Sequence, residues 1–211
     1  MTQARRYAGR DVDERRRDRR ARFLDAALEH FGTDGYAATS VSTICKTAGL
    51  SSRQFYAEFT DREHLLRQLY DHLQHDAQLA VGTTLINAGP VDTLEQLIDT
   101  AVRTFVDVYR ADPRKVRVSF VEVVGVSPQF EVHRQRQRAT WATLLADAVD
   151  AAAARGLSVT AASPLAWSAY IGAVNAALVM AVSDATISID DVVEIMRKLL
   201  TPGILGTATP Q

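Results

Sequence analysis

The chain has 211 residues, of which 47 % are apolar and 23 % are charged, and its formal net charge at pH 7 is −1. This balance is typical of a folded protein of one or two domains, and it excludes a mostly disordered or a collagen-like chain. The single cysteine, Cys45, cannot form an internal disulfide, and no apolar stretch follows the N-terminal arginines. Neither an oxidising compartment nor a secretory signal is indicated, and we expect a cytoplasmic protein.

The N-terminal segment is strongly basic. Residues 1–22 contain nine arginines and four acidic residues, whereas the rest of the chain is acidic on balance. A basic segment joined to an acidic body is consistent with an anionic partner. The alternative is a solvated helical extension, because three acid–arginine pairs have the spacing of ion pairs along one helix face: Asp11–Arg15, Asp13–Arg17 and Asp18–Arg22.

Apolar residues recur with helical spacing along nearly the whole chain. They predict a first helix over about residues 16–31, which Gly32 and Gly35 are expected to end by supplying backbone freedom. Two short helices follow, over about residues 41–48 and 52–58. Longer helices are expected over about residues 60–81, 94–112, 128–155, 164–183 and 190–201.

Two segments allow another interpretation. Residues 116–121 alternate apolar and polar and include β-branched side chains, which favours a strand, but no other stretch alternates to pair with it, so we predict a helix. Residues 165–182 carry no charge over 18 positions, which reaches the length of a membrane span. Polar residues interrupt this stretch and its downstream flank is acidic rather than basic. We therefore predict a helix buried in a bundle or a dimer interface, and an all-α chain of about nine helices without a membrane partner.

The most informative stretch is residues 39–66, which has the pattern of a helix-turn-helix. Ser40 and Ser51 can cap its two short helices, and Gly49 suits the positive φ of the turn between them. A second helix of about seven residues is too short to be stable alone. It is expected to rest on a three-helix core formed by Leu24, Leu28, Phe31, Ile44, Leu50, Phe55 and Phe59.

Polar residues open the second short helix, at the position from which a recognition helix contacts bases in the major groove. Ser52 is the first residue of this polar face. Arg53 can make a bidentate contact to guanine, and Gln54 can make the matching contact to adenine. The alternative for Gln54 is a capping box with Ser51, in which the side chain turns back to the backbone.

Residues 21–66 resemble the DNA-binding domain of the TetR (tetracycline-repressor-like) family of transcriptional regulators. The residues that carry the resemblance are Phe31-Gly32, Gly35-Tyr36, Thr39, Ile44, Ala48-Gly49-Leu50-Ser51, Phe55-Tyr56, Phe59, Arg62-Glu63 and Leu65-Leu66. Cys45 stands where the family usually has alanine, and Arg62 stands where it usually has lysine. Cysteine is also small, and arginine keeps the positive charge, so neither departure weakens the resemblance.

The resemblance implies a division of labour within the chain. Residues 1–66 would form the basic arm and the DNA-binding domain, and residues 67–211 would form a helical effector-binding and dimerisation domain. A homodimer, formed through the last two helices, would bind a pseudo-palindromic operator in double-stranded DNA. A small-molecule effector would shift the fourth helix and release the DNA, so we expect a repressor.

The resemblance also assigns roles to single residues. Tyr56, Arg62, Thr39 and Ser40 would contact phosphates, while the face of residues 52–54 would specify sequence through bases. Ser51, just before this face, is also a candidate for DNA binding. The alternative for Tyr56 is a core aromatic residue. The arginine-rich arm is a candidate for the neighbouring minor groove.

Large or isolated polar side chains on apolar helices are the candidates to line an effector pocket, although each is also a reasonable core residue: Phe105, Tyr109, Phe120, Glu122, Trp141, Trp167, Tyr170 and Asn175. Among these, Glu122 stands out because a carboxylate among apolar neighbours needs a partner or a raised pKa if it is buried. A basic cluster, His133, Arg134, Arg136 and Arg138, is expected to be a solvated helix face.

The sequence gives no support for catalysis. It lacks a Gly-x-Ser-x-Gly elbow, a phosphate-binding loop and a dinucleotide fingerprint. His72 and His75 share a helix face but no compact set of further ligands completes a metal site. We therefore predict no enzymatic activity, no cofactor and no metal. The alternative function is a helical small-molecule-binding enzyme whose N-terminal domain only resembles a DNA-binding one.

Overall fold

The computed structural model describes residues 3–87, 94–156 and 163–203, and every regular element within these ranges is helical. The prediction of an all-α chain is therefore confirmed for the described residues. In chain order the elements are α1 (Gln3–Thr33), α2 (Val41–Ala48), α3 (Ser52–Glu58), α4 (Arg62–Asn87), α5 (Leu94–Arg110), α6 (Pro113–Arg117), the π-helical turn η1 (Val118–Glu122), α7 (Pro128–Ala154), α8 (Pro164–Ser183) and α9 (Ile189–Gly203).

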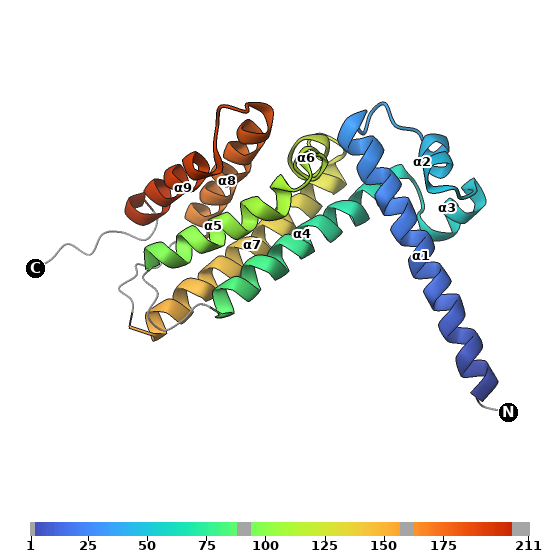
Figure 1. Cartoon of the computed structure of the whole chain (residues 1–211), viewed down its shortest axis with the longest axis horizontal. Helices are drawn as coiled ribbons and strands as arrows, with labels where there is room; N and C mark the ends of the chain where they lie inside the picture. Colours follow the sequence, from blue (N-terminus) through green and yellow to red (C-terminus); the bar gives the residue numbers. More distant parts are fainter. Residues whose placement is uncertain (1–2, 88–93, 157–162, 204–211) are drawn as a thin grey trace, which may run out of the picture.

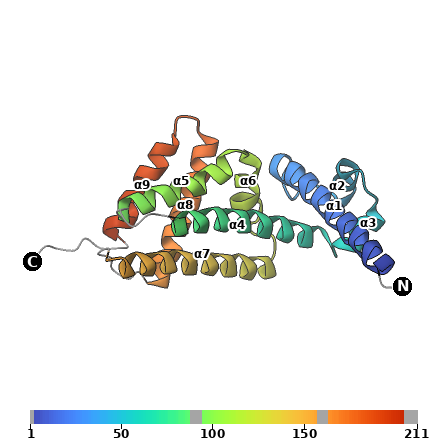
Figure 2. The same ribbon diagram turned by 60° about the horizontal axis from the view of Figure 1, so that its bottom comes forward.

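The molecule is elongated. Helices α1–α3 form one end of it, and α8 and α9 lie towards the other (Figure 1). Between them, α4 and α7 run alongside each other along the long axis, and α5 packs on α4 (Figure 2). Helix α4 leads directly from the end formed by α1–α3 into the larger helical body, so it is a continuous mechanical link between the two.

Two hydrophobic cores stabilise this arrangement. The smaller joins α1–α3 to the start of α4 and to η1, and the larger is enclosed by α4, α5, α7, α8 and α9. Leu65 and Leu69 of α4 belong to the first core, whereas Ala77 and Val81 of the same helix belong to the second. The division predicted at residue 66 thus falls within a helix that serves both cores.

Helix α1 differs from its prediction at both ends. It begins at Gln3, so the arginine-rich segment continues the helix. Gly32 does not end the helix by its backbone freedom, because it lies inside it. A Cβ at this position would come within 2.4 Å of the Arg114 Cβ, and glycine is needed for the close packing of α1 on α6. The chain turns only at Gly35, where φ is +95°.

The segment around residues 113–122 is helical, as predicted, and the strand alternative does not occur. Asp112 caps α6 by accepting a hydrogen bond from the Arg114 backbone N–H, and Pro113 occupies the first helical turn. The following turn, η1, is wider than an α-helix. The break expected at Ala88-Gly89-Pro90 lies outside the described residues.

Candidate nucleic-acid interface and interior cavity

The turn between α2 and α3 has the geometry expected of a helix-turn-helix. Ser40 caps α2 by accepting from the Thr43 N–H at 3.1 Å. Gly49 ends α2 in the left-handed region, with φ +62° and ψ 35°, where a side chain would be strained. Arg22 of α1 donates to the Ala48 carbonyl oxygen at 2.6 Å and fixes the turn from the side.

Helix α3 is held in place by aromatic packing. The side chains of Phe55 and Phe59 are buried, and Phe23 of α1 packs edge-on against both, with ring centroids 5.5 Å and 5.8 Å away. Because seven residues cannot form a stable helix in isolation, these contacts determine the position of α3. Its opposite face is left in solvent.

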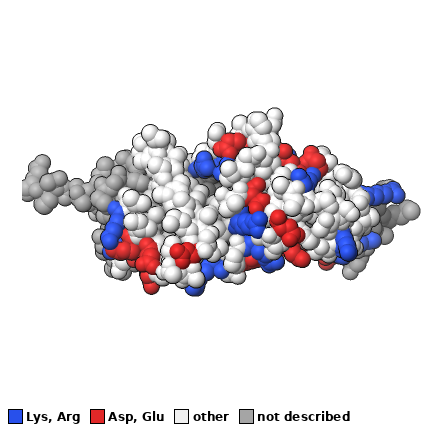
Figure 3. Space-filling view, turned by 90° about the horizontal axis from the view of Figure 1, so that it is seen from above, with Lys and Arg blue, Asp and Glu red and all other residues white. Residues whose placement is uncertain are grey.

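The exposed face of α3 carries most of the side chains predicted to contact DNA. Ser51, Ser52 and Arg53 are exposed, and Tyr56 keeps 60 % of its surface in solvent, so Tyr56 is not a core residue. Arg53 makes no hydrogen bond or ion pair within the described part of the chain. Lysine and arginine atoms are present at the end of the molecule that α1–α3 occupy and also along its middle (Figure 3). These side chains therefore point outward, as contacts to DNA require. The DNA contacts themselves remain a prediction.

Gln54 adopts the alternative conformation. Its N–H donates to the Ser51 hydroxyl at 3.3 Å, and its side-chain oxygen accepts from the Ser51 N–H at 2.9 Å, which forms a capping box. In this state Gln54 stabilises the start of α3. To contact adenine it would have to give up the bond to the Ser51 backbone.

Thr39 does not fit its predicted role. It is only 2 % exposed, and its hydroxyl donates to the Gly35 carbonyl oxygen at 2.8 Å. A phosphate could not reach this hydroxyl without disrupting the turn before α2, so we correct the assignment of Thr39 to a structural one. Ser40, next in the chain, is exposed and remains a candidate.

Arg62 is anchored more firmly than predicted. Its guanidinium donates to the carbonyl oxygen of Thr39 and lies 4.2 Å from the centroid of the Tyr36 ring. These contacts tie the start of α4 to the loop before α2. Arg62 therefore has a structural role, since it holds the loop before α2. Its contact to a DNA phosphate remains a prediction.

Three arginines of the basic segment converge on one buried carboxylate. The Glu58 side chain, at the end of α3, is 2 % exposed and pairs with Arg16 at 3.0 Å, Arg19 at 3.1 Å and Arg20 at 3.6 Å. Burial alone would raise the pKa of Glu58, but the hydrogen bonds and charges of Arg16 and Arg19 outweigh burial and lower the pKa below 4.5. Part of the basic arm therefore braces α3, whatever DNA contacts the rest makes.

Replacing Glu58 by glutamine is expected to make stability less dependent on acid. A lowered pKa means that the carboxylate stabilises the fold above its unfolded-state pKa of about 4.3, and that this stabilisation is lost as the pH falls through the folded-state value. At pH 7, Glu58→Gln should lower the free energy of unfolding by about 1–2 kcal/mol, since the arginines remain partly solvated. Urea unfolding at several pH values should show this difference shrinking below about pH 4.5. Glu14→Gln on exposed α1 is the control, and a difference that stays constant down to pH 3 would contradict the argument.

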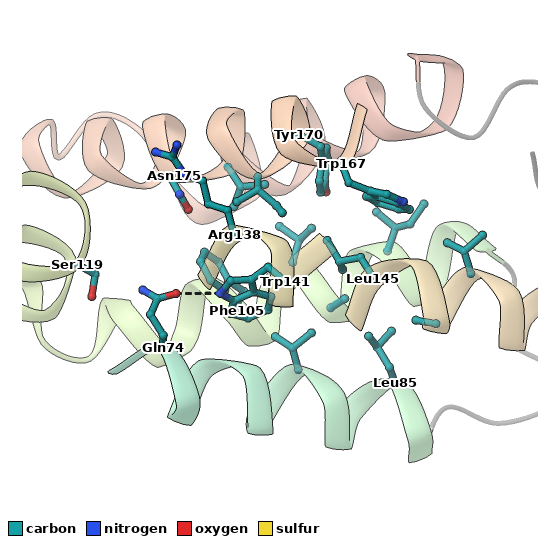
Figure 4. Close-up of a pocket in the computed structure, with 18 of the residues that line it drawn as sticks. Gln74, Leu85, Phe105, Ser119, Arg138, Trp141, Leu145, Trp167, Tyr170 and Asn175 are labelled. Carbon is teal, nitrogen blue, oxygen red and sulfur yellow. Dashed lines mark hydrogen bonds between the residues drawn. The ribbon is translucent and has the colours of Figure 1, made fainter. Parts of the chain in front are cut away.

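A cavity of about 110 Å³ lies in the larger core, between α4, α5, α7 and α8 (Figure 4). Six of the eight residues predicted to line an effector pocket do line it: Phe105, Phe120, Trp141, Trp167, Tyr170 and Asn175. Tyr109 lies behind this wall, fully buried, where its hydroxyl accepts from Gln74 at 3.2 Å. Gln74 in turn accepts from the Trp141 indole N–H at 2.8 Å, which is the dashed line in Figure 4.

Glu122 is not part of the cavity lining, so that prediction is corrected. Its carboxylate accepts from the Tyr36 N–H at 2.7 Å and from the Arg117 guanidinium at 2.9 Å. Arg117 also donates to the Thr33 carbonyl oxygen at 2.5 Å. The Glu122 carboxylate is therefore satisfied by Arg117 and by the loop that follows α1, and not by a ligand in the cavity. The sequence could not reveal this partner, because Tyr36 is 86 residues away.

Two arginines were wrongly predicted to be solvated. Arg134 is 9 % exposed and pairs with Glu131, and Arg138 is partly buried, and both line the cavity. They lie four residues apart on one face of α7, whereas Arg136 between them is exposed. The four-residue spacing was a signal that could have separated the inward pair from the outward residue.

Within the described part of the chain, no group of three or more histidine, cysteine, aspartate or glutamate residues could hold a metal ion. His72 lies 3.6 Å from Asp76 on the same helix and is largely exposed.

Helices α8 and α9 leave an apolar surface uncovered. On α8 the exposed positions form one stripe, and Leu165 and Met180 keep 79 % and 60 % of their surface in solvent. Ile195 and Leu199 of α9 keep 46 % and 43 % of their surface in solvent. Among the described helices, α8 alone is long and apolar enough to cross a membrane, and only 28 % of its most apolar window is buried. A core helix can pass the same test, so this is weak evidence for a span.

Known proteins resemble this chain in sequence over its N-terminal part. Residues 23–69 match the profile of the bacterial regulatory proteins of the tetR family. The HTH-type transcriptional repressor ComR of Escherichia coli (strain K12) is 37 % identical over 62 residues, which is 26 % of this chain and 30 % of that protein. The chain therefore matches less than a third of the length of this relative.

Solved structures extend the similarity to the whole fold. The fatty acid degradation regulator FadR from Bacillus halodurans superposes with a TM-score of 0.76 at 18 % identity, covering 88 % of this chain and 95 % of that one. The transcriptional regulator FadR from Bacillus subtilis, in complex with stearoyl-CoA, superposes with a TM-score of 0.75 at 17 % identity, covering 87 % and 98 %. At this level of identity the likeness shows the fold alone.

Proposed function

We propose that this chain, a member of the TetR family through its N-terminal domain, is a ligand-responsive transcriptional regulator that represses genes by binding a DNA operator. The observation that carries the proposal is the exposed face of α3 around Arg53, on a helix that Phe23 and the arginines paired with Glu58 hold in place. A rigidly held short helix with a polar, outward face is what reading of the major groove requires. The competing proposal is an enzyme that uses the cavity and only resembles a DNA-binding protein.

Binding to DNA distinguishes the two. A regulator is expected to select duplexes from a library of genomic fragments that includes the DNA beside its own gene. Its affinity should fall steeply with salt, since phosphate contacts release counterions. Absence of salt-sensitive duplex binding across the library would overturn the proposal.

Replacing Arg53 by alanine is expected to relax sequence preference. Loss of a bidentate contact to guanine should cost about 1–3 kcal/mol at one operator position, while affinity for unrelated DNA changes little. Fluorescence anisotropy with operators mutated one base pair at a time measures this. Lys46→Ala, which removes an exposed cation of α2, is the control and should weaken binding to all sequences alike. If Arg53→Ala weakens binding to all DNA sequences equally, Arg53 does not contact a base.

The functional unit that we propose is a homodimer joined through α8 and α9. Their uncovered apolar stripe needs a partner, and a second copy related by two-fold symmetry covers both faces at once. Two recognition helices would then meet a pseudo-palindromic operator with half-sites about 34–36 Å apart, or a small multiple of that distance.

The effector that we propose enters the cavity in the larger core, and the wall of this cavity offers a route to the DNA-binding end. Phe120 and Ser119 line the cavity, and Glu122, in the same π-helical turn, holds the Tyr36 N–H of the loop before α2. Helix α4 also borders the cavity, and Arg62 at its start holds the same loop. A ligand that moves either wall would shift α2 and α3. It can release DNA only by binding that shifted state more tightly.

A further inference from the structure

The cavity is elongated, and its polar and apolar groups are separated along its length. On α4 its lining extends from Tyr70 to Leu85, which is about 22 Å of helix. Gln74, Ser119 and Asn175 lie towards one end, and Leu85 and Leu145 lie towards the other (Figure 4). A compact polar ligand would leave the apolar end empty, so the shape favours a long molecule with one polar end.

The two arginines of the lining are not equivalent. Arg134 is neutralised by Glu131. Arg138 makes no hydrogen bond or ion pair within the described part of the chain, although it is partly buried beside Trp141. The Arg138 guanidinium is therefore free to pair with an anion supplied by a ligand, in a charge-assisted hydrogen bond.

Arg138 also borders a hollow on the surface. A hollow between α7 and α8 shares two of its residues, Arg138 and Trp167, with the cavity. The other residues of the hollow are small or polar: Gln135, Ala139, Ala142, Thr143, Ala146, Pro164 and Ser168. Arg138 therefore lies between the cavity and the surface.

A second polar group inside the cavity lacks a partner. Tyr170 is only 6 % exposed, and its hydroxyl makes no hydrogen bond to any residue that the structure describes. It comes from α8, across the cavity from α7 (Figure 4). A buried hydroxyl is normally hydrogen-bonded, so this unpaired group is a second sign of an oxygen-bearing ligand.

We infer that the effector is an anionic amphiphile, a single long apolar chain that ends in an anionic group, with the anionic end held by Arg138. This inference rests on the proposed function of the cavity and names the ligand class. A free fatty acid and an acyl-coenzyme A thioester share this chemistry. In this proposal the apolar chain extends between α4 and α7 towards Leu85, which requires the cavity of about 110 Å³ to widen.

Intrinsic fluorescence tests the ligand class without DNA, because both tryptophans of the chain, Trp141 and Trp167, line the cavity. The probes are dodecanoate, dodecanol, dodecyltrimethylammonium and dodecanoyl-coenzyme A, each below its aggregation concentration. Dodecanoate or dodecanoyl-coenzyme A is expected to bind at least tenfold more tightly than the alcohol and the cation. The anion that binds more tightly shows whether the effector is a free fatty acid or an acyl-coenzyme A thioester. Equal or tighter binding of the alcohol or the cation, or no binding by any probe, overturns the inference.

Variants of α7 test the role of Arg138. Arg138→Met is expected to weaken binding of the anionic probe by about ten- to one-hundredfold and to leave dodecanol unchanged, since it removes a charge-assisted contact and keeps a long apolar side chain. Arg136→Met, an exposed position on the same helix, should change neither. Equal effects of Arg138→Met and Arg136→Met, or equal effects of Arg138→Met on the anion and the alcohol, contradict the assignment.

Ala148→Phe tests the position of the chain, because it fills the cavity beyond Trp141. It should weaken dodecanoate more than hexanoate, and equal loss for both would place the chain elsewhere. Binding of genomic fragments is measured separately on the same preparations. If DNA binding persists while no anionic probe binds, the ligand class is wrong and the regulator stands. If the probes bind while DNA does not, the regulator fails and the ligand class stands.

Discussion

Replacing Phe23 by alanine is expected to unfold the DNA-binding end of the molecule while the larger core stays folded. The Phe23 ring is fully buried between the rings of Phe55 and Phe59. Removing it leaves a cavity and deletes both edge-on contacts, which should cost about 3–5 kcal/mol. Helix α3 depends on this packing because seven residues cannot hold a helix alone. Specific DNA binding should therefore be lost together with the helix.

Hydrogen exchange can locate the effect. Amides of α2 and α3 should lose protection in Phe23→Ala, whereas those of α5 and α8, in the other core, should keep theirs. Phe23→Leu is the matched control, because it keeps most of the buried volume, and it should retain DNA binding with a smaller loss of stability. Unchanged protection of α3 in Phe23→Ala would show that Glu58 and its arginines hold the helix without the aromatic cluster.

The local features of the fold were predictable because their causes are local. The turn at Gly49 and the caps at Ser40 and Ser51 follow from the conformational preferences of residues that are adjacent in the sequence. The missing partner strand, rather than a helical period, decided the segment around residues 116–121, where the alternating pattern alone was misleading. A strand needs a partner strand, and the described chain has none.

The errors concern contacts between residues far apart in the sequence. Gly32 has a different role from the one predicted because Arg114 packs against it, and Glu122 lies outside the cavity because Tyr36 holds its carboxylate. Thr39 is the exception, because its hydroxyl donates to the Gly35 carbonyl oxygen only four residues earlier. Arg138 faces inward because of how α7 packs against α4 and α8. Composition and periodicity give the apolar face of a helix, but which polar residues border that face depends on the neighbouring helices.

Introducing arginine at Ala176 is expected to give a folded monomer that binds its operator about 10²–10⁴-fold more weakly. Ala176 is exposed in the middle of the apolar stripe of α8, between Gly172 and Met180. In a two-fold interface each substitution occurs twice, so two charges would face an apolar surface without partners. Once the dimer is lost, each recognition helix binds its half-site separately, and the gain from linking two sites disappears.

Analytical ultracentrifugation and anisotropy with the full operator measure the two parts of this prediction. The thermal unfolding temperature should change little, because residue 176 faces solvent within a single chain. Ala151→Arg, an exposed alanine of α7, is the matched control and should leave both assembly and affinity unaltered. A dimeric Ala176→Arg protein with normal affinity would place the interface on another surface. The apolar stripe of α8 would then need a different partner, because its exposed apolar side chains remain costly in water.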